Sequence, residues 1–204
     1  MRIVGSVIAR IGSKRLTYKN LLPYRGEPLV LRAVRKLIKC SAIEAVVVST
    51  DSELIARTCM EEGVSILWRP ESLAGDEVAS IPVFQHIVDN HPCDLHINYN
   101  CNFPECEESV ILQAIEVATR TGEALSNPYA VWAQSKECLQ NYGDPFRITA
   151  TVFDSSQVHP LDVHTMNDLL QVHRENQSGI ELPAQEKKQF PVKSHDFGPI
   201  IRND

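Results

Sequence analysis

The sequence predicts an α/β protein in which helices cover a largely parallel sheet. Short apolar runs rich in Val and Ile indicate strands that are buried on both faces. These runs lie at residues 2–9, 45–50, 64–68 and 94–100. Amphipathic helical patterns follow them at residues 28–40, 52–63, 80–90 and 107–122. Strands that alternate with helices at this spacing form βαβ units, and such units build a parallel sheet.

Each predicted helix carries a signal for its apolar face, its start or its end. The helix at 28–40 places four apolar side chains on one stripe, opposite a row of cations: Leu29, Ala33, Leu37 and Cys40. Asp51 is the predicted N-cap of the second helix, and Gly63 its predicted stop. Pro82 is tolerated near the start of the third helix, and Gly122 ends the fourth.

The pattern weakens between residues 123 and 160, where 129–133 and 147–153 are the strand candidates. A last helix is predicted at 164–176. We therefore expect a single domain over residues 1–176. Residues 177–204 contain three prolines and mixed charges, which is typical of an arm or a disordered segment.

Composition places the chain among soluble globular proteins. It has 204 residues, 43% hydrophobic and 23% charged, and no apolar stretch approaches the roughly 18–20 residues of a membrane span. The first residues lead directly into a strand without a signal-peptide pattern, so we expect a cytoplasmic protein with no membrane partner. The cysteines lack paired zinc-site spacing, and we expect free thiols at Cys40, Cys59, Cys93, Cys101, Cys106 and Cys138.

Positive charge is concentrated at the beginning of the chain. Residues 1–39 hold ten Lys and Arg and one acid, a net charge of +9, whereas the whole chain carries −6. A basic beginning on an acidic body favours a local anion site over nucleic-acid binding along a whole face. Only 6% of the residues are aromatic, and no basic-aromatic interleaving suggests a base-stacking platform.

The loop at residues 9–20, "ARIGSKRLTYKN", lies where α/β proteins bind ligands, directly after the first strand. It matches neither the Walker A pattern nor G-x-G-x-x-G. Its residues nevertheless suit a polyphosphate. Gly12 lets backbone amides approach the phosphates, and the Ser13 hydroxyl can donate a hydrogen bond to them. Four cations can neutralise the phosphate charge: Arg10, Lys14, Arg15 and Lys19. The alternative is a solvated basic turn.

Four ordered segments over residues 7–80 resemble the cytidylyltransferases that activate acidic sugars. They read "IARIGSKRLTYKNL", "GEPLVLRAV", "VVVSTDSELIA" and "RPESLAGDEVAS". The resemblance is to CMP-N-acylneuraminate synthetases, including pseudaminate and legionaminate versions, and to CMP-Kdo synthetases. It implies a three-layer α/β/α nucleotidyltransferase fold, like that of nucleotide-diphospho-sugar transferases. It also implies Mg²⁺-assisted transfer of CMP from CTP to the sugar's anomeric hydroxyl, with release of pyrophosphate.

The resemblance assigns roles by position. Arg10, Ser13 and Lys19 would hold the triphosphate, together with Gly12, Lys14 and Asn20, and Arg69, Val78 and Ser80 would surround the cytidine. The alternatives are a helix-edge salt bridge for Arg69 and an N-cap for Ser80. Arg10, Lys19 and Asp162 are the predicted catalytic residues.

Two departures from the family pattern bear on the metal and on the acceptor. After the fourth strand the chain reads "INYNCNFPE", so Cys101 or a neighbour replaces a metal-binding Asp, and Asn98, Asn100 and Asn102 are the candidate acceptor ligands. Near residue 164 the family has acids, whereas this chain reads "LDVHTMNDLL". Asp162 and Asp168 remain, and His164 replaces an acid. Asp162 is then the predicted Mg²⁺ ligand. The alternative is a cap of the last helix.

Three functions remain open at this stage. The first is an active CMP-sugar synthetase with CTP and an acidic keto-sugar as partners. The second is a nucleotide-binding paralogue with a regulatory or interaction role. The third is a cytidylyltransferase for another anionic acceptor, such as a phosphonate. The resemblance also implies a homodimer, in which residues 123–160 reach a second subunit through Tyr129, Trp132 and Phe146, although an intramolecular flap is the alternative.

Overall fold

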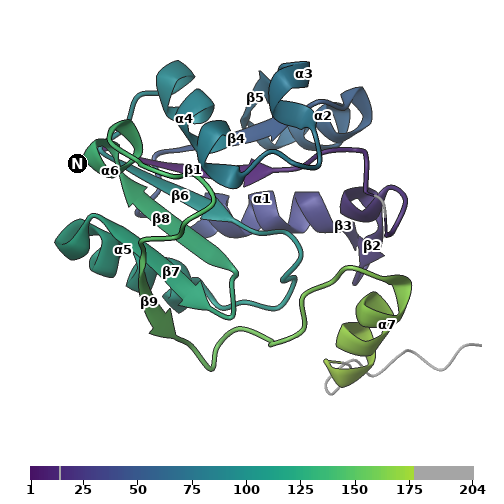
Figure 1. Cartoon of the computed structure of the whole chain (residues 1–204). Helices are drawn as coiled ribbons and strands as arrows, with labels where there is room; N and C mark the ends of the chain where they lie inside the picture. Colours follow the sequence, from purple (N-terminus) through teal and green to yellow (C-terminus); the bar gives the residue numbers. More distant parts are fainter. Residues whose placement is uncertain (14, 177–204) are drawn as a thin grey trace, which may run out of the picture.

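The structure is a computed structural model that describes residues 1–13 and 15–176. Its centre is a seven-stranded sheet in the order β5-β4-β1-β6-β8-β7-β9 (Figure 1). The strands are β1 (Ile3–Ile8), β4 (Ala45–Thr50), β5 (Ser65–Trp68), β6 (Leu95–Tyr99), β7 (Glu123–Asn127), β8 (Val131–Ser135) and β9 (Thr151–Asp154). Strands β5, β4, β1 and β6 are mutually parallel, and β7 is parallel to β9. Strand β8 runs against both of its neighbours.

Helices cover both faces of this sheet. The helices are α1 (Leu29–Lys39), α2 (Glu53–Cys59), α3 (Glu71–Ala74), α4 (Ser80–Asn90), α5 (Glu108–Thr121), α6 (Lys136–Gln140) and α7 (Met166–Glu175). One apolar core joins the sheet to α1, α2 and α5, and a second joins its other face to α4 and α6. The predicted three-layer α/β/α fold is confirmed. None of the helices in the described ranges is both long and apolar enough to cross a membrane.

A small third cluster holds the end of the described chain. A short 3-10 helix, η1 (Lys19–Leu21), leads into a hairpin of β2 (Pro23–Tyr24) and β3 (Glu27–Pro28). Helix α7 packs against this hairpin through Tyr24, Val163 and Leu169 (Figure 1). Residues near the two ends of the domain therefore lie side by side, and this closes the fold around the loop that follows β1.

The predicted strands and helices of the first 122 residues are confirmed to within a few residues, but the predicted N-cap of α2 is wrong. Ser52, not Asp51, is the N-cap of α2, and its hydroxyl accepts from the Ile55 amide. Asp51 instead accepts a hydrogen bond from the Ile11 amide, 3.1 Å away, and so anchors the basic loop. Gly63 does adopt a left-handed conformation (φ 73°) after the 3-10 turn η2 (Met60–Glu62) that extends α2.

The segment 123–160 differs more from expectation. Strand β7 has no predicted counterpart, and β8 and β9 begin two and four residues later than the candidate strands at 129–133 and 147–153. Trp132 is only 4% exposed, and its indole donates to Glu123, so the expectation that it anchors a second subunit is wrong. The last helix begins at Met166, after an N-cap at Thr165. Residues 177–204, predicted to be an arm, lie outside the described residues.

Candidate nucleotide site

A cavity of about 240 Å³ opens beyond the carboxyl ends of β1, β5 and β6. In open α/β sheets this edge is where ligands bind, because the loops after parallel strands meet there. Eight of the residues predicted from the sequence line it: Arg10, Asn20, Arg69, Val78, Ser80, Asn98, Asn100 and Asn102. These residues come from segments up to 92 positions apart in the chain, so the fold brings the predicted set together.

Two hydrogen bonds hold the beginning of the basic loop, one to the residue after β4 and one to the loop's own last residue. The Ile11 amide donates to Asp51, and the Asn20 side-chain amide donates to the Arg10 carbonyl at 2.9 Å. Gly12 and Ser13 do not line the cavity, and the Ser13 hydroxyl instead accepts from the Leu16 amide. Lys14 lies outside the described residues.

Arg69 places a buried guanidinium against the cavity. Its Nη2 donates to the Ser49 carbonyl at 2.8 Å, and its Nε donates to the Ser49 hydroxyl at 3.3 Å. Burial lowers the pKa of Arg69 to about 10. Among the described residues it makes no ion pair, so the salt-bridge alternative is wrong. A desolvated cation in this position favours an anionic or strongly accepting ligand.

Lys19, in η1, does not itself line the cavity but contacts one of its lining residues, Asn102. Its ammonium donates to Asn102 Oδ1 at 2.6 Å, and burial lowers its pKa, an effect that the nearby Cys101 and Asp162 partly oppose. Arg10, in contrast, forms an ion pair with Asp76, another cavity residue. A phosphate in the cavity would therefore compete with the Asp76 carboxylate for Arg10, and with the Asn102 side-chain oxygen for Lys19.

The three asparagines differ in the hydrogen-bonding capacity that they leave for a ligand. Asn100 donates to the Tyr129 carbonyl and accepts from the Asn102 amide, so it shapes the loop. Asn98 accepts from Ser6, and Asn102 accepts from Lys19, in each case through the side-chain oxygen. The side-chain NH₂ groups of Asn98 and Asn102 have no hydrogen-bond acceptor within the described chain. Two amide donors are therefore available at the cavity.

Ser80 is the first residue of α4, because Ala79 occupies the N-cap, so the N-cap alternative for Ser80 is wrong. Tyr129 lies beside it in the cavity wall, where burial raises the pKa of the phenol to about 12 and a hydrogen bond with Ser80 opposes the rise. Cys101 also lines the cavity, and its thiol donates to Asn20 at 3.2 Å. All six cysteines are free, as predicted.

Sequence reasoning missed Asp76, Tyr129 and the anchoring role of Asp51. Asp76 stands inside the quoted segment "RPESLAGDEVAS", two residues after the end of α3 and four before Ser80, so the sequence did carry a signal for it. Tyr129 offered no such signal, because it reaches the cavity only through the antiparallel pairing of β8 with β6. Asp51 follows β4 directly and was misassigned to the helix start.

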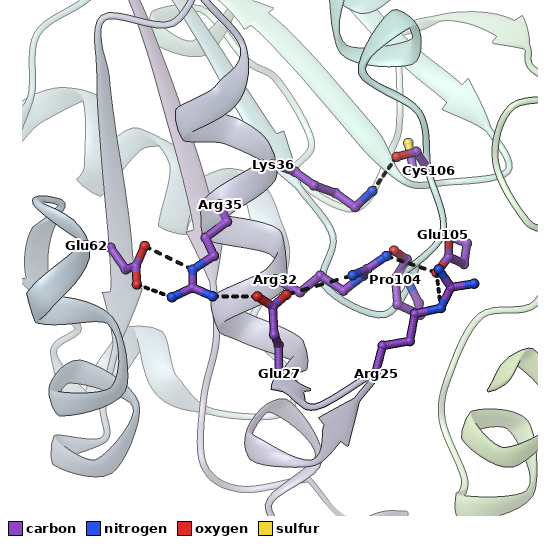
Figure 2. A network of polar contacts seen from close by, with 9 residues as sticks. All are labelled: Arg25, Glu27, Arg32, Arg35, Lys36, Glu62, Pro104, Glu105 and Cys106. Carbon is purple, nitrogen blue, oxygen red and sulfur yellow. Dashed lines mark hydrogen bonds and ion pairs between the residues drawn. The ribbon is translucent and has the colours of Figure 1, made fainter. Parts of the chain in front are cut away.

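Three other cations of the first 39 residues, Arg25, Arg32 and Lys36, hold the loop that follows β6 (Figure 2). Arg32 donates to the Pro104 carbonyl at 3.0 Å and to Glu105 at 2.9 Å, and Lys36 donates to the Cys106 carbonyl at 2.6 Å. Because this loop also carries Asn100–Asn102, the cationic face of α1 supports the cavity wall from behind. We name residues 100–107 the β6 loop.

The β6 loop in turn carries the segment that leads to Asp162. The Val163 amide donates to the Asn102 carbonyl at 3.1 Å, and the His159 amide donates to the Glu105 carbonyl at 2.8 Å. The carboxylate of Asp162 is thereby placed near Lys19 and Cys101. Its negative charge partly offsets the lowering of the Lys19 pKa by burial and adds to the rise that burial causes in the pKa of the Cys101 thiol. Asp162 is not the helix cap, because Thr165 and Asp168 form the capping box of α7.

The residues around Asp162 fit a metal held by a single protein carboxylate. Oδ1 of Asp162 is buried and accepts no hydrogen bond from the described residues, whereas Oδ2 lies 2.8 Å from His164 Nε2. A carboxylate oxygen of this kind suits a hard cation such as Mg²⁺. Across residues 1–13 and 15–176 no group of three or more His, Cys, Asp or Glu is arranged for metal binding. Ligand phosphates and water would have to complete the coordination.

The chain matches curated cytidylyltransferases over different lengths. A CMP-N,N'-diacetyllegionaminic acid synthase of Legionella pneumophila is 43% identical over 77 residues, covering 37% of this chain and 33% of that protein. An N-acylneuraminate cytidylyltransferase of Streptococcus agalactiae is 25% identical over 170 residues, covering 82% of this chain and 36% of that protein. The chain therefore spans about a third of the length of these relatives.

Solved structures share the fold. A CMP:2-keto-3-deoxy-manno-octonic acid synthetase complexed with CTP superposes with a TM-score of 0.75 at 15% identity, covering 88% of this chain and 100% of that one. A Mycobacterium tuberculosis protein in complex with manganese gives a TM-score of 0.62 at 18% identity, covering 85% and 99%. The family model described as Cytidylyltransferase matches residues 4–192. With this match over nearly its whole length, the chain belongs to the cytidylyltransferase family, alongside the CMP-sugar synthases.

Proposed function

We propose that this chain transfers CMP from CTP to the anomeric hydroxyl of an acidic keto-sugar, with release of pyrophosphate. The acceptor would be of the neuraminate, pseudaminate, legionaminate or Kdo type. The observation that carries the proposal is the cavity beyond β1 and β6, which is lined by the desolvated guanidinium of Arg69 and by the amide donors of Asn98 and Asn102. The desolvated ammonium of Lys19 contacts the cavity wall at Asn102. Membership of the cytidylyltransferase family supports the same reading.

The chemistry requires positioning and charge neutralisation more than covalent catalysis. The acceptor hydroxyl loses its proton to the solvent as its oxygen forms a bond to the α-phosphorus of CTP, and the bond from that phosphorus to the bridging oxygen of the pyrophosphate breaks. Negative charge then grows on the leaving pyrophosphate. Arg10 lines the cavity and Lys19 contacts its wall at Asn102, and we expect both cations to neutralise that charge. The amide donors of Asn98 and Asn102 would orient the acceptor.

Asp162 is the proposed metal ligand, through its unpartnered Oδ1. Mg²⁺ bound there would supply additional positive charge at the phosphates. With one protein carboxylate, the site would bind the metal weakly by itself and more strongly together with CTP.

A pyrophosphate-release assay tests the proposal directly. Each of the four nucleoside triphosphates is offered with a panel of acidic keto-sugars and one phosphonate, with Mg²⁺. We expect release only with CTP and at least one keto-sugar. Release with the phosphonate alone would identify the other anionic acceptor instead.

A second candidate function is a nucleotide-binding paralogue that performs no transfer. It is favoured by the ion pair between Arg10 and Asp76 and by His164 in place of an acid. The paralogue would bind CTP with Mg²⁺ but release no pyrophosphate with any acceptor. This outcome would replace the enzyme proposal.

Asp162→Asn separates a metal ligand from a merely structural residue. We expect this variant to bind CTP without metal as the unmodified chain does, but to lose pyrophosphate release. Asp89→Asn, an exposed acid near the end of α4, is the matched control and should keep full activity. Equal turnover in the two variants would rule out Asp162 as the metal ligand.

We also infer a homodimer contact around residues 144–152. Phe146, Ile148 and Val152 are 74%, 51% and 58% exposed, and three apolar side chains so close in sequence favour burial against another surface. Light scattering of the unmodified chain and of Phe146→Glu tests this, with dimer and monomer masses expected respectively. A monomeric mass for the unmodified chain would contradict it.

A further inference from the structure

Arg15, His164 and Asp162 form a chain of contacts that joins the basic loop to the proposed metal ligand. Arg15 Nη2 lies 2.9 Å from His164 Nδ1, although the two residues are 149 positions apart. On the other side of the imidazole, His164 Nε2 lies 2.8 Å from Asp162 Oδ2. The imidazole therefore stands between a guanidinium and a carboxylate.

Hydrogen-bonding capacity determines the direction of each contact. A guanidinium has donors only, so His164 Nδ1 must accept from Arg15 and carries no proton in this arrangement. The single proton of the neutral ring is then on Nε2, which donates to Asp162 Oδ2. Both ring nitrogens are engaged, so His164 has no lone pair left for a metal. Of the Asp162 oxygens, only the buried Oδ1 remains without a partner in the described residues.

The backbone around His164 is fixed from two sides. The amides of His164 and Thr165 both donate to Asp168 Oδ2, at 2.9 and 2.7 Å, within the capping box of α7. The Val163 amide donates to the Asn102 carbonyl of the β6 loop. The imidazole is therefore presented to Asp162 from a segment with little freedom to shift.

We propose that His164 is a positioning residue that turns Asp162 Oδ1 toward the metal and nucleotide, and that couples this carboxylate to Arg15. This inference rests on the proposed function. An imidazole at position 164 adds no second carboxylate beside Asp162. Metal binding then depends on the nucleotide phosphates. The imidazole, which contacts both side chains, fixes the position of Asp162 relative to Arg15.

The first test is the tautomer of His164, measured by ¹⁵N NMR of the imidazole in the unliganded full chain. We expect the proton on Nε2 and none on Nδ1. His164→Gln is the second tool, because its amide offers one acceptor and two donors at about the reach of Nε2. His164→Ala removes both contacts, and His91→Ala, at the end of α4, is the control for loss of a histidine elsewhere.

The second test is Mn²⁺ binding, followed by electron paramagnetic resonance with and without CTP. Loss of a partner that orients a metal ligand typically weakens metal affinity by about 10- to 100-fold, and we expect this for His164→Ala in the presence of CTP. His164→Gln should recover most of the affinity, and His91→Ala should match the unmodified chain. Affinity for CTP without metal should be alike in all four proteins.

A proton on Nδ1 of His164, or unchanged Mn²⁺ affinity in His164→Ala, would overturn the inference while leaving the proposed function in place. Failure of the unmodified chain to bind CTP would overturn the proposed function itself, and the inference with it. The two failures are therefore distinguishable.

Discussion

Replacing Lys19 with methionine tests whether the basic loop binds a polyphosphate or is only a solvated turn. The substitution keeps most of the aliphatic stem and removes the ammonium that donates to Asn102 at 2.6 Å. Two effects on stability oppose each other. A hydrogen bond from a charged group is lost, at about 1.5–3 kcal/mol, but the cost of burying the ammonium, which lowers its pKa, is also removed.

The net change in the free energy of unfolding should therefore be about 1 kcal/mol or less, which is a shift of about 2–4 °C in the thermal midpoint for a chain of this size. The effect on CTP should be far larger. A charge-assisted contact to a phosphate in a desolvated site is worth about 2–4 kcal/mol, which corresponds to a loss of about 30- to 700-fold in affinity.

Isothermal titration calorimetry with CTP and Mg²⁺ measures this loss. Lys39→Met is the matched control, since Lys39 is an exposed lysine in the last turn of α1, outside the basic loop. The control should bind CTP as the unmodified chain does. Equal dissociation constants for the two variants would refute the reasoning, and the loop would then be an ordinary basic turn.

Three further predictions follow from the same contacts. Burial lowers the pKa of Lys19 below its usual 10.5, so CTP affinity should fall as the pH rises through that lowered value, and Lys19→Arg should remove the fall; a titration that is flat up to the ordinary lysine range would contradict this. Burial lowers the pKa of His96 from 6.5 to about 4, so the folded state resists protonation and stability should decrease by about 3 kcal/mol as the pH falls from 6.5 toward 4. Urea unfolding of His96→Gln should lack this decrease, and an equal slope in both proteins would show that other groups cause it. Arg32→Met removes the donor to the Pro104 carbonyl and leaves Glu105 with Arg25 as its remaining ion-pair partner. The thermal midpoint should therefore drop by about 4–10 °C and CTP affinity should weaken with it, whereas an unchanged midpoint would mean that the β6 loop is held without Arg32.

The cationic face of α1 illustrates how far sequence reasoning reaches. The helix and its apolar stripe follow from local periodicity, and both are confirmed. What the cations contact does not follow from periodicity. Arg32 and Lys36 reach backbone carbonyls 70 or more residues away in the β6 loop, and Arg35 pairs with Glu27 and Glu62. Such contacts depend on how the helix is docked on the sheet, which no local pattern encodes.

Strand β8 illustrates the same limit within the fold. Its run of apolar residues indicates a strand, but not its direction or its partner. Only the tertiary structure shows that it pairs antiparallel with β6 and carries Trp132 into the core. The same pairing places Tyr129 at the cavity.

Local sequence patterns predicted the fold class, the order of the first strands and helices, and the place of the basic loop at the carboxyl edge of the sheet. These follow from hydrophobic periodicity, capping and turn residues, which act over a few positions along the chain. Which charged groups meet depends on the packing of these elements against one another. This packing paired Arg10 with Asp76, and it linked Arg15 through His164 to Asp162 across 149 positions. Contacts of this kind arise when packed elements bring distant loops to one edge of the sheet, so their partners become visible only once the packing is known.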